Sequence, residues 1–146
     1  MTYEIALTRM TALCSTAEHC ESDVRERLQR AGLCAEDADR LVGFLYDEGY
    51  LDTGRFCRAF AHDKLRFAHW GRVKIAQALR LKGLPATDID IALDELPETE
   101  YAEALHSVLD GKARTLRDED EYTRRGKLIR FALGRGFAMD EILDAL

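Results

Sequence analysis

Apolar residues recur along the chain at intervals of three and four residues, as in the run Ala6, Met10, Leu13 and Ala17. This spacing places their side chains on one side of a helix. No segment alternates apolar and polar residues over the length of a strand. The pattern predicts an all-helical chain, with helices over residues 4–19, 22–31, 35–48, 53–68, 71–82, 87–95, 98–115, 118–134 and 138–146.

One set of apolar positions with a glycine occurs three times along the chain. The second copy lies 51 residues after the first, and the third lies 53 residues after the second. The apolar positions keep a similar bulk, except that an alanine takes the second place in the third copy. The three sets are Val24, Leu28, Gly32, Leu33, Ala38 and Val42; Ile75, Leu79, Gly83, Leu84, Ile89 and Leu93; and Leu128, Ala132, Gly136, Phe137, Ile142 and Leu146.

The repeated glycines, Gly32, Gly83 and Gly136, each follow about three turns of predicted helix and precede an apolar residue. We expect each glycine to end its helix in the left-handed conformation, with the next apolar side chain folded back onto that helix. A shorter helix then begins, and Thr87-Asp88-Ile89-Asp90 has the spacing of a capping box.

Each repeat also has one helix before this helix–turn–helix pair, so each repeat contains three helices. The fold class is therefore predicted to be all-α, with three tandem three-helix repeats in an elongated, curved modular arrangement. The expected repeats are residues 1–52, 53–96 and 97–146. Such small units bury their apolar faces by packing against neighbouring units.

The chain has the length of one average domain, 146 residues, of which 47% are hydrophobic and 33% charged. This composition supports a packed core and is not typical of a disordered chain. Its longest apolar runs are far shorter than the roughly 20 residues that cross a bilayer. The N-terminal residues lack the pattern of a signal peptide. We therefore expect a cytoplasmic protein with no membrane contact.

Four cysteines, Cys14, Cys20, Cys34 and Cys57, are scattered without a C-x-x-C pair. Their spacing to the four histidines does not match a zinc site, so we expect no bound metal and free thiols in a reducing compartment. The chain also lacks a phosphate-binding glycine loop, an H-E-x-x-H motif and a nucleophile elbow. We therefore expect no catalytic residue, no cofactor and no enzymatic activity.

The formal net charge of −6 hides a strong segregation of charge along the chain. Residues 55–84 carry eight basic side chains and one acidic side chain, a net charge of +7. A second basic group lies between residues 123 and 139, which contain no acidic residue. Residues 85–121 contain twelve acidic and three basic side chains, a net charge of −9. A mean charge therefore says little about the partners of this protein.

The predicted helix over residues 53–68 has a basic side formed by Arg55, Arg58, His62 and Arg66, spaced three, four and four residues apart. Ordinary solvated helix faces mix charges of both signs, which allows ion pairs four residues apart. A face without acids repels itself unless an external anion relieves the repulsion. A phosphate backbone or an acidic protein surface would serve as that anion, while a solvated basic face remains the plain alternative.

The aromatic residues of the middle repeat invite a structural interpretation. Phe56, Phe60 and Phe67 recur on a second side of the same helix, and we expect them to pack in the core. Trp70, the only tryptophan, lies in the short link between two basic helices. Two interpretations are open: its side chain packs between these helices, or it binds a partner together with the neighbouring Arg72.

The middle repeat contains, in order, Tyr50-Leu51-Asp52, Arg55-Phe56, Phe60, Lys64, Arg66, Trp70-Gly71, Lys74-Ile75, Leu79 and Lys82-Gly83-Leu84. This series resembles the signature of the RecX family. The N-terminal segment Ala12-Leu13-Cys14-Ser15 with Glu18 is similar to the family's first helix. The ending is similar to its last repeat, through Lys127-Leu128-Ile129-Arg130-Phe131, Arg135-Gly136-Phe137, Glu141-Ile142 and Ala145-Leu146. The resemblance covers essentially the whole chain and implies three tandem three-helix repeats.

The resemblance also implies a function, because RecX proteins are bacterial regulators of the RecA recombinase. They bind in the helical groove of the RecA filament on single-stranded DNA, inhibit ATP hydrolysis and strand exchange, and promote filament disassembly. We therefore expect a monomeric, non-enzymatic inhibitor of RecA, with weak direct DNA binding as a further possibility. The expected contact residues are Arg55, Arg58, Lys64, Arg66, Trp70, Arg72, Lys74, Arg80, Lys82, Arg124, Arg125, Lys127 and Arg130.

A DNA-binding protein that acts alone is the alternative hypothesis, since three-helix units can present a helix to the major groove. The segment 71–82 offers few side chains that read bases, with Gln77 as its only amide. Steep salt dependence of tight binding to naked duplex would favour this alternative. For the regulator, we expect reversal of Arg58, Arg66 and Arg72 to glutamate to abolish inhibition and to leave the fold intact.

Overall fold

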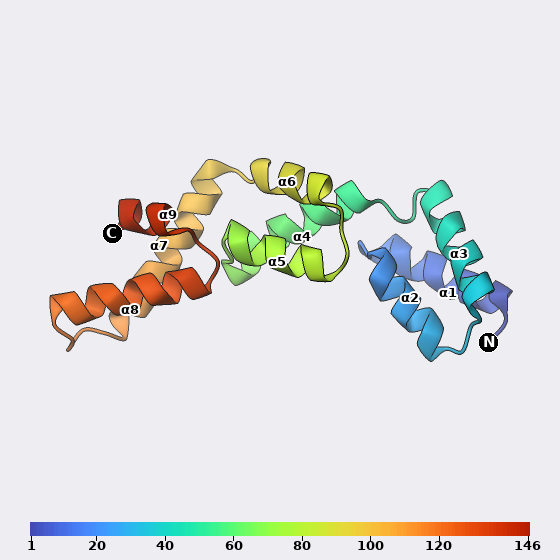
Figure 1. The fold of residues 1–146 in the computed structure, drawn as a ribbon, viewed down its shortest axis with the longest axis horizontal. Helices are drawn as coiled ribbons and strands as arrows, with labels where there is room; N and C mark the ends of the chain where they lie inside the picture. The colour runs from blue at the N-terminus through green and yellow to red at the C-terminus, as the bar shows by residue number, and fades with distance from the viewer.

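The computed structural model describes all residues from 1 to 146 and contains nine helices and no strand. The helices form three groups of three, which follow one another along the long axis of an elongated molecule (Figure 1). The all-α prediction is therefore confirmed. The helices are α1 (Tyr3–Thr16), α2 (Glu21–Arg30), α3 (Ala35–Asp47), α4 (Thr53–Ala68), α5 (Arg72–Leu81), α6 (Ala86–Asp94), α7 (Glu98–Arg114), α8 (Glu121–Gly134) and α9 (Met139–Ala145).

We call α1–α3 the first unit, α4–α6 the second unit and α7–α9 the third unit. Two helices differ from the sequence prediction by three residues at one end. Helix α1 ends at Thr16 instead of residue 19, because Ala17 is already extended and the chain reverses before α2. Helix α8 begins at Glu121 instead of residue 118, because the carboxylate of Asp120 accepts the Thr123 N–H at 2.7 Å and caps the helix there.

The repeated glycines have the predicted conformation, with φ of +82° at Gly32, +85° at Gly83 and +99° at Gly136. The residue after each glycine donates its N–H back to the helix that has just ended; in the second unit, Leu84 donates to the Leu79 carbonyl at 3.1 Å. The expected capping box at Thr87 is wrong. Pro85 is the N-cap of α6, and Thr87 already lies inside the helix.

Two hydrophobic cores hold the helices together. The smaller core belongs to the first unit and contains Ala6, Val24, Leu28, Ala38, Leu41, Val42, Leu45 and Leu51. The larger core is continuous through the second and third units and takes in a single residue of the first unit, Cys20. The second and third units therefore share one interior, whereas the first unit has its own.

Polar contacts join the first unit to the second. Arg55 at the start of α4 forms an ion pair with Glu18 and donates to the Gly49 carbonyl at 2.9 Å. Lys82 Nζ lies 3.5 Å from a carboxylate oxygen of Asp23 on α2. None of the extensive helix–helix contacts of the molecule joins α1–α3 to the later helices. We call this the first junction.

Backbone contacts join the second unit to the third. The Gly71 N–H donates to the Arg135 carbonyl at 2.8 Å, and the Val73 N–H donates to the Gly136 carbonyl at 3.0 Å. A β-carbon on Gly71 would lie 2.4 Å from the Gly136 carbonyl group, and one on Gly136 would lie 2.5 Å from the β-carbon of Lys74. Only glycines allow this approach. We call this the second junction.

The phenylalanines of α4 do not all pack in the core. Phe56 is buried and stacks on the partly buried Phe60, as expected, but the side chain of Phe67 is 77% exposed. The buried side of α4 is centred on Ala61 and Leu65. Phe67 follows Leu65 by two residues, which turns it by about 200° around the helix axis and toward solvent.

The four cysteines are free thiols, of which Cys20 and Cys57 are buried. No group of three or more His, Cys, Asp or Glu side chains is placed to hold a metal ion. None of the nine helices combines the length and the apolar character that crossing a membrane requires.

Candidate partner-binding surface

The thirteen residues singled out in the sequence lie in two places, on the second unit and on α8 of the third unit. Those of the second unit lie on α4, on α5 or next to them, and those of the third unit all lie on α8. The structure separates the twelve cations among them by their partners. Six form ion pairs with carboxylates of this chain: Arg55, Arg58, Arg66, Arg72, Lys82 and Lys127.

The basic side of α4 faces two glutamates of the acidic segment, residues 85–121. Arg58 lies 3.9 Å from a carboxylate oxygen of Glu95, and Arg66 lies 3.6 Å from one of Glu100. The His62 ring is 3.2 Å from the second oxygen of Glu100. The interpretation of this face as a set of unmatched positive charges is therefore wrong. The acids that match it come from the link and helix that follow α6, thirty or more residues away in the sequence.

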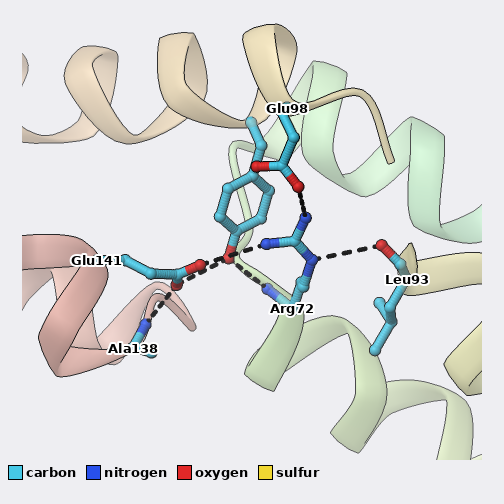
Figure 2. Close-up of polar contacts among 6 residues, drawn as sticks. Arg72, Leu93, Glu98, Ala138 and Glu141 are labelled. Atoms are coloured by element: carbon cyan, nitrogen blue, oxygen red, sulfur yellow. Dashed lines mark hydrogen bonds and ion pairs between the residues drawn. The ribbon is translucent and has the colours of Figure 1, made fainter. Parts of the chain in front are cut away.

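Arg72 is the centre of a polar network that joins four helices, and Figure 2 shows its contacts. Its guanidinium lies 3.1 Å from Glu98 of α7 and 3.2 Å from Glu141 of α9, and it donates to the Leu93 carbonyl of α6 at 3.3 Å. The guanidinium also lies over the Tyr101 ring, 3.9 Å from its centroid. The side chain is only 26% exposed. These contacts assign Arg72 to holding the second and third units together.

Tyr101 completes this network from α7. Its hydroxyl accepts the Arg72 backbone N–H at 3.0 Å and donates to Glu141 at 3.1 Å, while the Ala138 N–H donates to the same Glu141 oxygen at 2.9 Å. Burial raises the pKa of Tyr101 to about 12, because the phenolate would lose hydration and face the Glu141 carboxylate. The neutral phenol is thus part of the folded structure.

Six of the thirteen residues are cations that pair with no carboxylate within 4 Å. We call them the unpaired cations: Lys64, Lys74, Arg80, Arg124, Arg125 and Arg130. Three lie in the second unit and three on α8. Because no acid of this chain offsets their charge at close range, they attract external anions more strongly than the paired residues do.

Trp70 lies between two of the unpaired cations. The Nζ atoms of Lys64 and Lys74 are each 4.7 Å from the centroid of its indole ring. The ring is also packed against the larger core and is partly buried. Trp70 therefore packs inside the protein, as the first of its two interpretations expects. Its ring also holds two ammonium groups at the protein surface.

Helix α8 presents a shallow groove of about 410 Å³ beside the other unpaired cations. Arg125 and Arg130 line it together with Gly126, Ile129 and Tyr122, whose side chain is 90% exposed. The sequence reasoning did not select Tyr122. Its spacing of three residues from Arg125 and eight from Arg130 places it on the same side of the helix, and this spacing could have drawn attention to it.

The chain is similar to proteins of one family over almost its whole length. Residues 54–93 match the family model described as "RecX, second three-helix domain", and residues 98–146 match "RecX, third three-helix domain". The "Regulatory protein RecX" of Pelodictyon phaeoclathratiforme is 30% identical over 141 residues, which cover 97% of this chain and 86% of that protein. The protein of the same name from Escherichia coli strain SE11 is 26% identical over 152 residues, covering 97% and 90%.

Solved structures show the same fold. A crystal structure of regulatory protein RecX superimposes with a TM-score of 0.87 at 23% identity, covering 97% of this chain and 71% of that one. The crystal structure of RecX from Lactobacillus salivarius superimposes with a TM-score of 0.85 at 14% identity, covering 98% and 93%. The relatives are named as regulatory proteins and not as enzymes.

Proposed function

This chain belongs to the RecX family, and we propose that it inhibits the RecA recombinase by binding in the helical groove of the RecA filament on single-stranded DNA. In this proposal the protein modulates DNA repair and recombination without catalysing a reaction of its own. It acts in the cytoplasm as a monomer.

The unpaired cations are the observation that carries this proposal. They lie in the second unit and on α8, with no carboxylate of this chain within 4 Å. A nucleoprotein filament offers anions of two kinds, DNA phosphates and carboxylates of the recombinase. Binding of either kind relieves the repulsion among the cations, and it weakens as salt is added.

The elongated arrangement of the units supports the same proposal. Three units in a row present a long surface, which suits a repeating filament better than a compact ligand. The paired residues Arg58, Arg66 and Arg72 contribute less to binding in this proposal, because their charges are already matched within the chain. The triple reversal of Arg58, Arg66 and Arg72 is therefore a poor test, since the loss of Arg72 disturbs the contact between the second and third units.

A sharper test reverses unpaired cations only. The variant K74E/R80E changes the second unit, and R125E/R130E changes α8. We expect each to raise the protein concentration that half-inhibits RecA ATPase on single-stranded DNA by about tenfold, which corresponds to about 1.4 kcal/mol of binding. The control R9E/R117E makes the same change of charge at two exposed arginines that have no carboxylate partner and lie outside the proposed surface.

Several outcomes would contradict the proposal. One is a wild-type protein that leaves the ATPase unchanged at micromolar concentration. Another is a control variant that loses as much inhibition as K74E/R80E. Tight binding to naked duplex DNA with a steep salt slope, without an effect on the recombinase, would favour a DNA-binding protein that acts alone.

A further inference from the structure

Tyr122 of α8 is the one tyrosine of this chain whose ring has no partner. The hydroxyls of Tyr46 and Tyr101 donate to glutamates, an arginine covers the ring of Tyr3, and the ring of Tyr50 stacks on a phenylalanine. The side chain of Tyr122 is 90% exposed, its hydroxyl makes no hydrogen bond, and its ring meets no aromatic or cationic group. The ring is therefore free to bind a partner from outside the chain.

A glycine keeps the space beside this ring open. Gly126 follows Tyr122 by four residues and Ile129 follows it by seven, so the three residues form one stripe along α8. Glycine lowers the stability of a helix interior. At this position it removes the side chain that would otherwise lie against the ring. The groove of about 410 Å³ is lined by this stripe, so a second flat ring has room beside Tyr122.

Positive charge flanks the stripe on both sides. Successive residues of a helix are about 100° apart, which places Arg125 and Arg130 on opposite sides of the stripe. Both arginines are exposed, and both belong to the unpaired cations. The Arg130 guanidinium reaches back along the helix, since a β-carbon on Gly126 would lie 3.4 Å from one of its nitrogens. The groove therefore attracts anions.

The acidic residues that precede Tyr122 do not line the groove. The carboxylate of Asp120 caps α8 by accepting the Thr123 N–H at 2.7 Å. Glu119 accepts a hydrogen bond from Lys127 Nζ at 2.6 Å. The groove thus combines a free aromatic ring with positive charge, and this combination suits an anionic ligand that also has flat apolar parts.

Single-stranded nucleic acid has both properties. Its bases stack on exposed aromatic side chains, and its phosphates bind guanidinium groups. A duplex keeps the faces of its bases inside its own stack, and an acidic peptide would use the arginines but not the ring. We propose that the α8 groove binds single-stranded DNA, with one base stacked on Tyr122 and the adjacent phosphates held by Arg125 and Arg130.

This inference rests on the proposed function for the source of the strand, and it deepens that proposal by assigning α8 to the DNA of the filament. The proposed function leaves open whether these cations bind DNA phosphates or carboxylates of the recombinase. A naked strand without RecA tests the inference separately from the inhibition of RecA.

The test measures the fluorescence anisotropy of a labelled thymidine oligonucleotide that is titrated with the full-length protein. We expect Y122A to raise the Kd about tenfold, as for the loss of one stacked base. Y122F keeps the ring and loses only a hydroxyl without a partner, so we expect it to bind as the wild type does. The control F67A removes a ring that is 77% exposed on α4, outside the groove, and we expect no change in the Kd.

A strand without bases separates stacking from attraction to phosphates. We expect the wild type to bind an abasic oligonucleotide of the same length and charge about tenfold more weakly than the thymidine strand, and Y122A to bind the two strands alike. R125E/R130E should weaken the binding of both strands and reduce the dependence of the Kd on salt, because fewer phosphates are neutralised. A uridine RNA strand of the same length checks the source of the ligand, and DNA should bind at least as tightly. Circular dichroism checks that each variant is folded.

The inference is overturned if Y122A binds the thymidine strand as tightly as the wild type, or if F67A loses as much affinity as Y122A. Equal affinity of the wild type for the abasic and thymidine strands also overturns it, since phosphates alone then account for binding, and so does tighter binding of RNA than of DNA. Inhibition of RecA ATPase by a protein that does not bind the naked strand refutes this inference alone. Binding of the strand through Tyr122 without any inhibition of the ATPase refutes the proposed function alone.

Discussion

The first and second junctions join neighbouring units of the same array by different means. At the first junction, long side chains cross between units, as in the ion pairs of Arg55 with Glu18 and of Lys82 with Asp23. At the second junction, two buried glycines bring backbone against backbone, and a single core continues through both units.

This difference has a physical consequence for motion. Flexible charged side chains hold a pair of surfaces weakly, because each exposed pair contributes about 1 kcal/mol or less and is screened by salt. Direct backbone hydrogen bonds over a shared core leave little freedom, since a shift of either element breaks many contacts at once. We therefore expect the second and third units to move as one body, with the first unit free to reorient.

The comparison also bears on the proposed binding surface. The unpaired cations lie on both sides of the second junction, so a rigid contact there keeps Lys74 and Arg125 at a constant separation. A repeating filament presents its anions at regular positions, and a rigid pair of units matches such a pattern without the cost of ordering it on binding. The first unit, with no predicted contact residue, can adapt its position.

The strongest way to break the second junction is to add a methyl group where the glycines meet. We expect G136A to lower the free energy of unfolding by about 4 kcal/mol, from a steric clash together with a left-handed alanine. G71A adds the clash without the unfavourable φ, and we expect about 2–3 kcal/mol. Chemical denaturation followed by circular dichroism measures both values.

G83A serves as the matched control for these variants. Gly83 has the same left-handed conformation, but a β-carbon there meets nothing within 4 Å. We expect a loss of only about 1 kcal/mol, from the backbone conformation alone. Equal losses in G83A and G136A would show that close approach at the second junction contributes nothing.

Replacing the arginine at each junction compares the two junctions through smaller losses of folding free energy. We expect R72M to cost about 2 kcal/mol of folding free energy, because it leaves the half-buried Glu141 without its cation and removes a hydrogen bond to Leu93. We expect R55M to cost less than about 1 kcal/mol, since Arg55 is 43% exposed. Denaturation in low and high salt compares the two, and a larger loss for R55M would reverse the assignment of strong and weak junctions.

Alkaline pH tests the second junction in another way, through the ionisation of Tyr101. Burial raises the pKa of this phenol to about 12 from an ordinary value of 10. The folded state therefore binds the proton more tightly than the unfolded chain does. The corresponding stability is complete below pH 10 and is lost as the pH rises toward 12.

The variant Y101F lacks this proton, so the stability difference between the wild type and Y101F should shrink as the pH rises from 9 to 11. Urea denaturation of both proteins at these pH values measures it. A difference that stays constant would mean that the neutral hydroxyl of Tyr101 does not stabilise the second junction.

Local rules account for much of what the sequence predicted correctly. The spacing of apolar residues predicts all nine helices, because the buried side of an amphipathic helix requires an apolar residue about every 3.6 positions. The glycine at the end of each second helix is likewise a local requirement, and Gly32, Gly83 and Gly136 are all left-handed. The failure at Thr87 is local too, because Pro85 caps α6 before the expected motif begins.

The pairing of charges could not be predicted in the same way. Glu95, at the end of α6, meets Arg58 because α6 packs against α4, and Glu100 of α7 meets Arg66 because α7 also packs against α4. The linear segregation of charge gave no sign of these contacts. Of the twelve predicted contact cations, six are paired within the chain, and the proposed function therefore rests on the six that are not. The spacing of Tyr122 relative to Arg125 and Arg130 could be read from the sequence, but its exposure beside them is known only from the structure.

By itself, the sequence determined the helices, their threefold repetition, the glycine turns and the family, because each of these depends on residue types at short and regular spacings. The tertiary structure decided which charges remain unmatched, which apolar side chains stay exposed and which junction is rigid. Gly136 illustrates the division. Its place in the repeat predicts a left-handed turn, but its contact with Gly71 depends on packing between residues 65 positions apart, which no local pattern encodes.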